Sequence, residues 1–123
     1  MSWRVMSTHL DLRSRHRRRQ FATLLDQLVP SPRQPTVLMG DFNEWMPGSP
    51  TLRPFLRQAA DTRPPASFPS WLPVLALDRV LAYWVGAPLH CRRYGSALAR
   101  RASDHLPVVM EIGPAAGLSA GIA

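Results

Sequence analysis

The 123-residue sequence contains no lysine, only two glutamates and a single cysteine. Because one cysteine cannot form an intrachain disulfide, Cys91 excludes a disulfide-stapled framework. No segment approaches the ~20 apolar residues of a membrane span, and no long apolar core typical of a secretory signal follows Met1. These absences predict one cytoplasmic domain, or part of one, without a membrane span.

All fifteen basic residues are arginine, and the formal net charge is +7. A charge of this size is compatible with binding to nucleic acid or another polyanion. The lack of lysine, together with abundant alanine and proline, also indicates a GC-rich coding bias, so the charge alone does not establish a polyanion ligand. The hydrophobic fraction of 46% is that of a globular protein rather than a disordered chain.

Two elements are predicted before residue 30. The segment from Trp3 to Leu10 predicts a strand that carries His9 at its C-terminal end. A lone histidine there is more often structural than functional. The segment from Ser14 to about Val29 predicts a helix with one buried face formed by Phe21, Leu24, Leu25 and Leu28. Five arginines crowd its first turns, where the helix dipole disfavours cations, and a solvated helix end is favoured over a phosphate-binding or targeting patch.

The apolar run from Thr36 to Met39 predicts a buried strand, and Gly40 is expected to let the backbone turn sharply at its end. Asp41 and Asn43 are two residues apart, so in an extended backbone both side chains point to one side while Phe42 points into the protein. Polar residues at the mouth of a strand are typical of functional sites in α/β proteins. An ordinary turn that caps the strand is the alternative.

Three elements are predicted next: a short helix from Thr51 to Gln58, a long ordered loop from Asp61 to Pro73, and a strand from Val74 to Trp84. The strand places Asp78 on an otherwise apolar face. A carboxylate there needs a partner to offset its desolvation, and the candidates are a histidine or the arginines at residues 92–93.

The last part of the chain predicts short strands at Leu89–Tyr94 and Val108–Ile112, with a flexible tail at 113–123. The remaining residues before 103 have no clear pattern. Asp104 and His105 precede the final strand, and from a loop both side chains could face one site.

Polar side chains from four segments thus lie at strand ends or on interior faces. Oxygen ligands from Asp41 and Asp104 suit a hard cation such as Mg²⁺. A histidine oriented by a carboxylate is a competent general base, and Asp78 could orient His105 in this way.

Two further side chains complete the set. Asn43 could steady a phosphate oxygen or an attacking water, and His9 could donate a hydrogen bond to an anionic transition state. Metal-assisted hydrolysis of a phosphoester needs this mixture of groups.

The order and local sequence of four segments resemble the endonuclease/exonuclease/phosphatase superfamily, the deoxyribonuclease-I-like hydrolases. The matching segments are Ser7-Thr8-His9-Leu10, Leu38-Met39-Gly40-Asp41-Phe42-Asn43, Leu77-Asp78-Arg79-Val80 and Ala102-Ser103-Asp104-His105-Leu106-Pro107-Val108. The first and third are weak motifs alone, whereas Gly-Asp-Phe-Asn and Ser-Asp-His-Leu-Pro are specific. Their common order argues against coincidence.

The resemblance implies a Mg²⁺-dependent phosphoester hydrolase of the phosphodiesterase, nuclease or phosphatase type, with Mn²⁺ as an alternative metal. The implied catalytic residues are His9, Asp41, Asn43, Asp78 and His105, and the implied metal ligands are Asp104 and Asp41. His105 would be the general base oriented by Asp78, and His9 would hydrogen-bond the phosphate. Asp41 and Asn43 would position the water and the scissile phosphate.

One departure from the family pattern is large. Family members begin with a first half that carries a strand-borne Asn and then a Gln-Glu pair whose Glu is the main Mg²⁺ ligand. Neither Glu44 nor Glu111 matches that position. Residues 1–112 therefore resemble the C-terminal portion of the domain. The implied fold is α+β, about half of a four-layer α/β/β/α sandwich.

Because the metal-binding glutamate is missing, the resemblance leaves open whether this chain alone is an enzyme. Half of a sandwich would leave an apolar sheet face uncovered, which predicts self-association or pairing with an N-terminal half. The expected ligand is a phosphoester, and nucleic acid is one candidate. The alternatives to a hydrolase are a non-catalytic truncated half-domain and a basic nucleic-acid-binding module.

Overall fold

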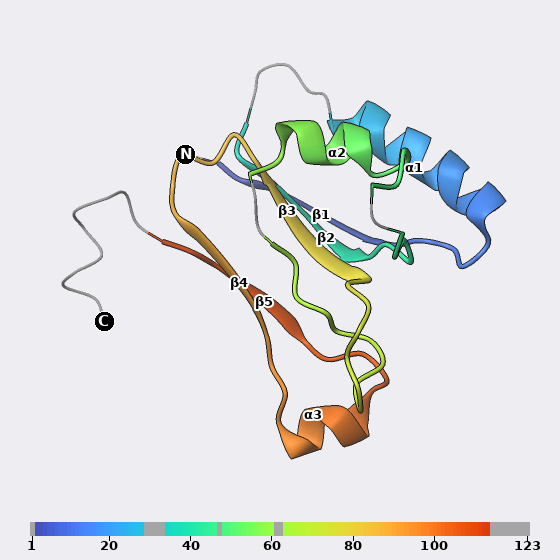
Figure 1. Cartoon of the computed structure of the whole chain (residues 1–123). Helices are drawn as coiled ribbons and strands as arrows, with labels where there is room; N and C mark the ends of the chain where they lie inside the picture. Colours follow the sequence, from blue (N-terminus) through green and yellow to red (C-terminus); the bar gives the residue numbers. More distant parts are fainter. Residues whose placement is uncertain (1, 29–33, 47, 61–62, 114–123) are drawn as a thin grey trace.

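A computed structural model describes residues 2–28, 34–46, 48–60 and 63–113 of the chain. The chain contains both helices and strands, with parallel and antiparallel strand pairs, which confirms the predicted α+β class (Figure 1). In chain order they are β1 (Arg4–His9), α1 (Ser14–Leu28), β2 (Thr36–Asp41), α2 (Arg53–Gln58), β3 (Asp78–Tyr83), β4 (Leu89–Arg93), α3 (Ala97–Ala102) and β5 (Val108–Ile112). The predicted flexible tail, apart from Gly113, lies outside the described residues. Among those residues no helix is long and apolar enough to cross a membrane.

The central sheet has the strand order β1-β2-β3. β1 pairs with β2 in parallel, and β2 pairs with β3 in antiparallel orientation. The register aligns side chains in rows across the three strands. One face carries an apolar row formed by Val5, Val37 and Ala82. At the carboxyl end of β1 and β2 the same face carries a polar row formed by His9, Asp41 and Asp78.

Helices α1 and α2 cover the other face of this sheet (Figure 1). Phe21 of α1 packs edge-on against Phe42 at 5.8 Å between ring centroids and lies 5.2 Å from Phe55 of α2. Leu38 and Tyr83 from the sheet are fully buried in the same core. The apolar spacing of α1 therefore identified its buried face correctly.

The open face of the sheet is only partly covered, by the antiparallel pair β4–β5 on the side away from the helices (Figure 1). An apolar groove of about 430 Å³ runs between the two layers. Trp3 and Val5 at its rim are 43% and 62% exposed, and Val109 and Ile112 of β5 are each 37% exposed. The arrangement is one α/β layer and a narrow piece of a second sheet, as expected for half of a sandwich.

The predicted strand from Val74 to Trp84 is too long, because β3 begins only at Asp78. The preceding residues fold back on the long loop instead. Leu75 forms an isolated bridge with Phe68, and the backbone N–H of Ser67 donates to the Leu75 carbonyl at 2.9 Å. The loop therefore takes the hydrogen bonds that a longer strand would have made.

Helix α3 has no counterpart in the sequence prediction. Ser96 caps it, since its side-chain oxygen accepts a hydrogen bond from the Ala99 backbone N–H at 3.1 Å. No residue of α3 is buried. A six-residue helix without a buried face carries no apolar periodicity, so the pattern that identified α1 is absent here.

Candidate active site

The polar row at the edge of the central sheet brings three predicted site residues together. His9 ends β1 and is the register partner of Asp41, which ends β2, while Asp78 begins the antiparallel β3 opposite Asp41. The Nε2 atom of His9 lies 3.7 Å from Oδ2 of Asp41. Residues far apart in the chain thus meet because two parallel strands end, and an antiparallel strand begins, at one edge.

Gly40 has a different role from the predicted one. No sharp turn occurs there, because β2 continues through Asp41. The residue has φ of +146°, and a Cβ atom built on it would lie 1.8 Å from the carbonyl oxygen of Thr8 in β1. Glycine is therefore required for the close approach of β1 to β2, which sets the spacing between His9 and Asp41.

His105 reaches this row from the loop between α3 and β5. Its Nδ1 atom lies 2.7 Å from Oδ2 of Asp78, and its Nε2 atom lies 3.6 Å from Oδ2 of Asp41. The ring of Phe68 packs against the imidazole at 4.8 Å between centroids. Of the partners considered for Asp78, the histidine is the one found.

Opposing influences act on His105. Burial by itself lowers the pKa of the imidazole, but the hydrogen bond to Asp78 and the negative charges of Asp78, Asp41 and Asp104 outweigh it, so the net pKa is raised. A carboxylate only accepts hydrogen bonds, so Nδ1 must donate to Asp78. In the neutral ring this leaves the lone pair on Nε2, which faces the cavity beside Asp41.

The loop at residues 63–77 supplies a contact that the sequence did not indicate. The hydroxyl of Ser67 donates to Oδ2 of Asp78, the oxygen that also accepts from His105. The Leu106 backbone N–H donates to the Ser67 carbonyl at 2.8 Å and ties the two loops together. A serine in a proline-rich loop carries no motif, so only the fold could identify it.

The backbone at Asn43 is not extended, as the prediction for its side chain had assumed. Its φ is +49°, and its side-chain amide donates to the carbonyl of Leu10, just past β1. Its backbone N–H donates to Oδ1 of Asp41 at 2.9 Å. Asn43 is buried and lines a second cavity beside His9, so it both joins two strand ends and borders the site.

A divalent cation is the group that the sequence resemblance implies. Atoms of Asp41, Asp78 and His105 that could ligate a metal all lie within 4.8 Å of one another. Oδ2 of Asp78 already accepts two hydrogen bonds, whereas Oδ2 of Asp41 faces the two imidazoles. Asp41 therefore offers a carboxylate oxygen to a cation that takes its other ligands from water and substrate, as Mg²⁺ commonly does.

The predicted ligand Asp104 lies apart from that group within the described part of the chain. Its side chain is exposed, and its backbone carbonyl accepts a hydrogen bond from Ser70 at 2.7 Å. Glu44, the glutamate next to Asn43, is buried and pairs with Arg17 at 3.5 Å. Glu44 is thus engaged on the helix side of the sheet.

A cavity of about 420 Å³ opens over the row and is bordered by Asp41, Asp78 and His105. The sequence model of the Endonuclease/Exonuclease/phosphatase family matches residues 4–105, which include His9, Asp41, Asp78 and His105. The chain belongs to this family.

The known proteins that this chain resembles in sequence and structure are longer than the chain itself. The uncharacterized protein YbhP of Escherichia coli K12 is 34% identical over 121 residues, which cover 88% of this chain and 45% of YbhP. A functionally unknown conserved protein from Enterococcus faecalis V583 has a TM-score of 0.73 at 22% identity, covering 89% of this chain and 49% of that chain.

An endonuclease/exonuclease/phosphatase from Beutenbergia cavernae DSM 12333 has a TM-score of 0.58 at 26% identity, covering 88% of this chain and 35% of that chain. The chain therefore spans about half the length, or less, of the proteins that it matches. This agrees with a deoxyribonuclease-I-like fold represented by one half.

Proposed function

We propose that this chain carries the general-base half of a metal-dependent phosphoester hydrolase. The observation that carries the proposal is the 2.7 Å contact between His105 Nδ1 and Asp78 Oδ2, with Nε2 facing the cavity beside Asp41. An imidazole fixed in one tautomer by a carboxylate is suited to take a proton from water.

His105 and Asp78 act together on the attacking water. Nε2 of His105 accepts the proton, and the Asp78 carboxylate stabilises the imidazolium that forms. The Ser67 hydroxyl holds the same carboxylate oxygen and restricts its rotation. The ring of Phe68 limits the movement of the imidazole on its face.

His9 acts on the phosphate. Its side chain is 79% exposed at the mouth of the site, within 3.7 Å of Asp41. A protonated His9 would donate to a non-bridging phosphate oxygen as negative charge develops there. Asn43 fixes the strand ends that carry His9 and Asp41.

A cation is needed because Asp41 and Asp78 would otherwise repel an anionic phosphoester. Asp41 would hold Mg²⁺, or Mn²⁺ in its place, and water and substrate would supply the other ligands; Asp104, the other predicted ligand, lies apart from Asp41. The bound metal would supply Lewis-acid polarisation of the phosphate. Nucleic acid and smaller phosphoesters both satisfy this description of the substrate.

The test is hydrolysis of bis-para-nitrophenyl phosphate with Mg²⁺ or Mn²⁺. It should use this chain alone and this chain combined with the part of YbhP that lies outside the matched region. We expect His105→Gln to lower the rate by about a hundredfold to ten-thousandfold. His90→Gln, on the exposed face of β4, is the matched control. Equal rates of hydrolysis for the two variants would contradict the proposal. Full hydrolytic activity in the presence of a metal chelator would also contradict it.

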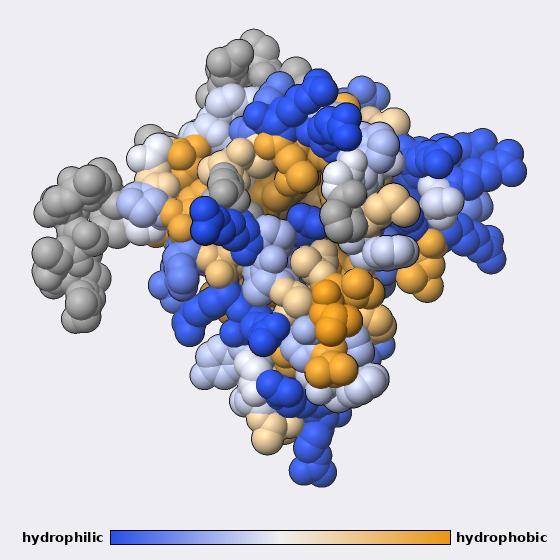
Figure 2. All heavy atoms as spheres, viewed as in Figure 1, coloured by the Kyte–Doolittle hydropathy of each residue, from blue (hydrophilic) through white to orange (hydrophobic). Residues whose placement is uncertain are grey.

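A second candidate, a basic nucleic-acid-binding module, is favoured by the arginines at the start of α1. Arg15, Arg18 and Arg19 are exposed, whereas Arg17 is buried. Figure 2 shows strongly hydrophilic surface over the region where this end of α1 lies in Figure 1. Salt-sensitive DNA binding that requires these exposed arginines, but neither His105 nor a divalent metal, would support this candidate.

A further inference from the structure

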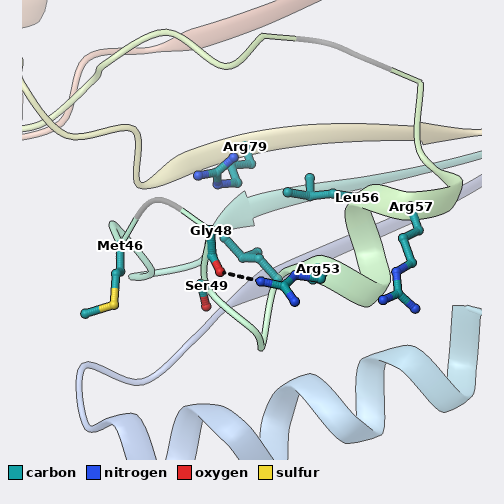
Figure 3. A pocket seen from close by; sticks show the side chains of 8 residues that line it. Met46, Gly48, Ser49, Arg53, Leu56, Arg57 and Arg79 are labelled. Atoms are coloured by element: carbon teal, nitrogen blue, oxygen red, sulfur yellow. Dashed lines mark hydrogen bonds between the residues drawn. The ribbon is translucent and has the colours of Figure 1, made fainter.

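A third cavity lies on the helix side of the central sheet, between β3, α2 and the loop after β2 (Figure 3). Its volume is about 300 Å³. In Figure 2 a hollowed hydrophobic area, framed by hydrophilic side chains, lies where Figure 1 places the space between α2 and β3. The lining combines an apolar surface with three arginines: Met46, Leu52, Leu56, Arg53, Arg57 and Arg79.

Arg79 is the arginine of this lining with a buried atom that lacks a hydrogen-bond partner among the described residues. It follows Asp78 in β3, so its side chain points to the helix side while Asp78 faces the catalytic cavity. Its Nε atom is buried without a hydrogen-bond partner within the described part of the chain. Burial lowers the pKa of the guanidinium and the charge of Glu44 raises it, but Glu44 already pairs with Arg17.

Arg53 and Arg57 lie four residues apart on α2, a spacing that makes side chains neighbours on a helix surface. In Figure 3 Arg53 extends toward Gly48, and Arg57 lies nearer the other end of α2. Arg53 donates to the carbonyl of Gly48 at 3.2 Å, which is a neutral group. No carboxylate belongs to the lining of this cavity among the described residues. Three arginines therefore border an apolar hollow, and the carboxylate whose charge acts on Arg79, that of Glu44, lies outside the lining.

Guanidinium groups bind phosphate and carboxylate in paired hydrogen bonds, and a phosphate dianion matches several cations better than a carboxylate does. Leu56 is 44% exposed and Met46 is 52% exposed, so an apolar body can contact both. We propose that this cavity binds a small organic phosphate, with its phosphoryl group on the arginines and its apolar body on Met46, Leu52 and Leu56.

This site lies on the helix side of β3 and the hydrolytic one on the other side, with Arg79 at the border of both cavities. Among the described residues its lining holds neither a histidine nor a carboxylate, so it offers no group to activate water. The ligand would bind intact, without the divalent cation that Asp41 and Asp78 require. The two sites can therefore be tested independently.

The experiment measures binding of phenyl phosphate by calorimetry to the whole chain carrying His105→Gln, in the presence of a chelator. Phenyl phosphate should bind more tightly than either inorganic phosphate or phenylacetate. Arg53→Gln with Arg57→Gln should weaken binding by about a hundredfold, since removing one guanidinium from a phosphate weakens binding by about tenfold. Arg92→Gln, which removes an exposed arginine on β4, should leave the affinity unchanged.

Three results would overturn the proposal. One is that millimolar phenyl phosphate produces no heat of binding in calorimetry, or no NMR chemical-shift change in the backbone amides around α2. Another is equal affinity in the Arg53→Gln/Arg57→Gln chain, measured on protein whose circular dichroism matches the parent. The third is phenylacetate or inorganic phosphate binding as tightly as phenyl phosphate. Loss of hydrolytic activity in other experiments has no bearing on these outcomes.

Discussion

The imidazole of His105 and the carboxylate of Asp78 are joined by one 2.7 Å contact between residues separated by 27 positions in the chain. That contact assigns the proton of the neutral ring to Nδ1. It also raises the pKa of His105, against the opposite effect of burial. The geometry and the titration of the proposed general base therefore depend on the same neighbour.

We expect an NMR titration to place the His105 pKa above the ordinary value of 6.5, and Asp78→Asn to bring it down. Because the pKa of His105 is higher in the folded chain than in the unfolded chain, its protonation stabilises the fold. This contribution is complete at a pH below the pKa of the unfolded chain, and it is lost as the pH rises through the pKa of the folded chain. The free energy of unfolding should fall over that interval. His105→Gln should remove this pH dependence while His90→Gln keeps it, and a His105 pKa below 6.5 would contradict the prediction.

Gly40→Ala should destabilise the fold by about 2–4 kcal/mol, because the added Cβ would meet the backbone of Thr8 and the residue has a positive φ. The measurement is urea unfolding followed by circular dichroism. Gly86→Ala is the matched control, since a Cβ there meets nothing within 4 Å and should change stability by less than about 0.5 kcal/mol. Similar losses for both variants would show that β1 does not need this close approach.

Arg17→Met should cost about 3 kcal/mol of stability, because it leaves the buried carboxylate of Glu44 without its cation. The side chains of this pair are only 10% and 11% exposed. The exposed pair between Arg92 and Glu111 provides the comparison, and Arg92→Gln should cost less than about 1 kcal/mol. Thermal unfolding of the two variants side by side tests the difference, and equal losses would contradict it.

The uncovered apolar face predicts that copies of this chain associate when no other polypeptide covers that face. Sedimentation velocity should show a larger species at high concentration. Val5→Asp should reduce it, because Val5 is 62% exposed beside the groove. Leu98→Asp on α3 replaces an equally apolar residue that is 77% exposed and lies away from the groove. A concentration-independent monomer, or equal effects of both variants, would exclude this face as the contact.

Much of the central sheet could be predicted from the sequence because its strands and α1 have clear periodicity. The apolar spacing of α1 follows directly from one buried face, and the continuous apolar run before Gly40 follows from a strand that is buried on both faces. The four polar segments could also be assigned to one site, since the motifs place them at strand ends. His9, Asp41, Asp78 and His105 do come together in the structure.

What could not be predicted depends on contacts between distant segments. Ser67 reaches Asp78 only because the long loop folds back on itself, and no local pattern encodes that. The left-handed backbone of Asn43 redirects its side chain to Leu10, which spacing alone cannot show. The need for glycine at residue 40 arises from a neighbouring strand rather than from a turn.

The in-register row of His9, Asp41 and Asp78 also restricts how this protein can change in length. Deleting or inserting one residue within β2 would shift its alternation and turn Asp41 toward the helices, while core side chains such as Leu38 would face the groove. Among the residues that the structure describes, the segment between Glu44 and Leu77 contains no strand of this sheet, so inserting or deleting one residue there does not reverse the direction of the site side chains. Length variation among homologous chains should therefore accumulate in that segment and be nearly absent from β2.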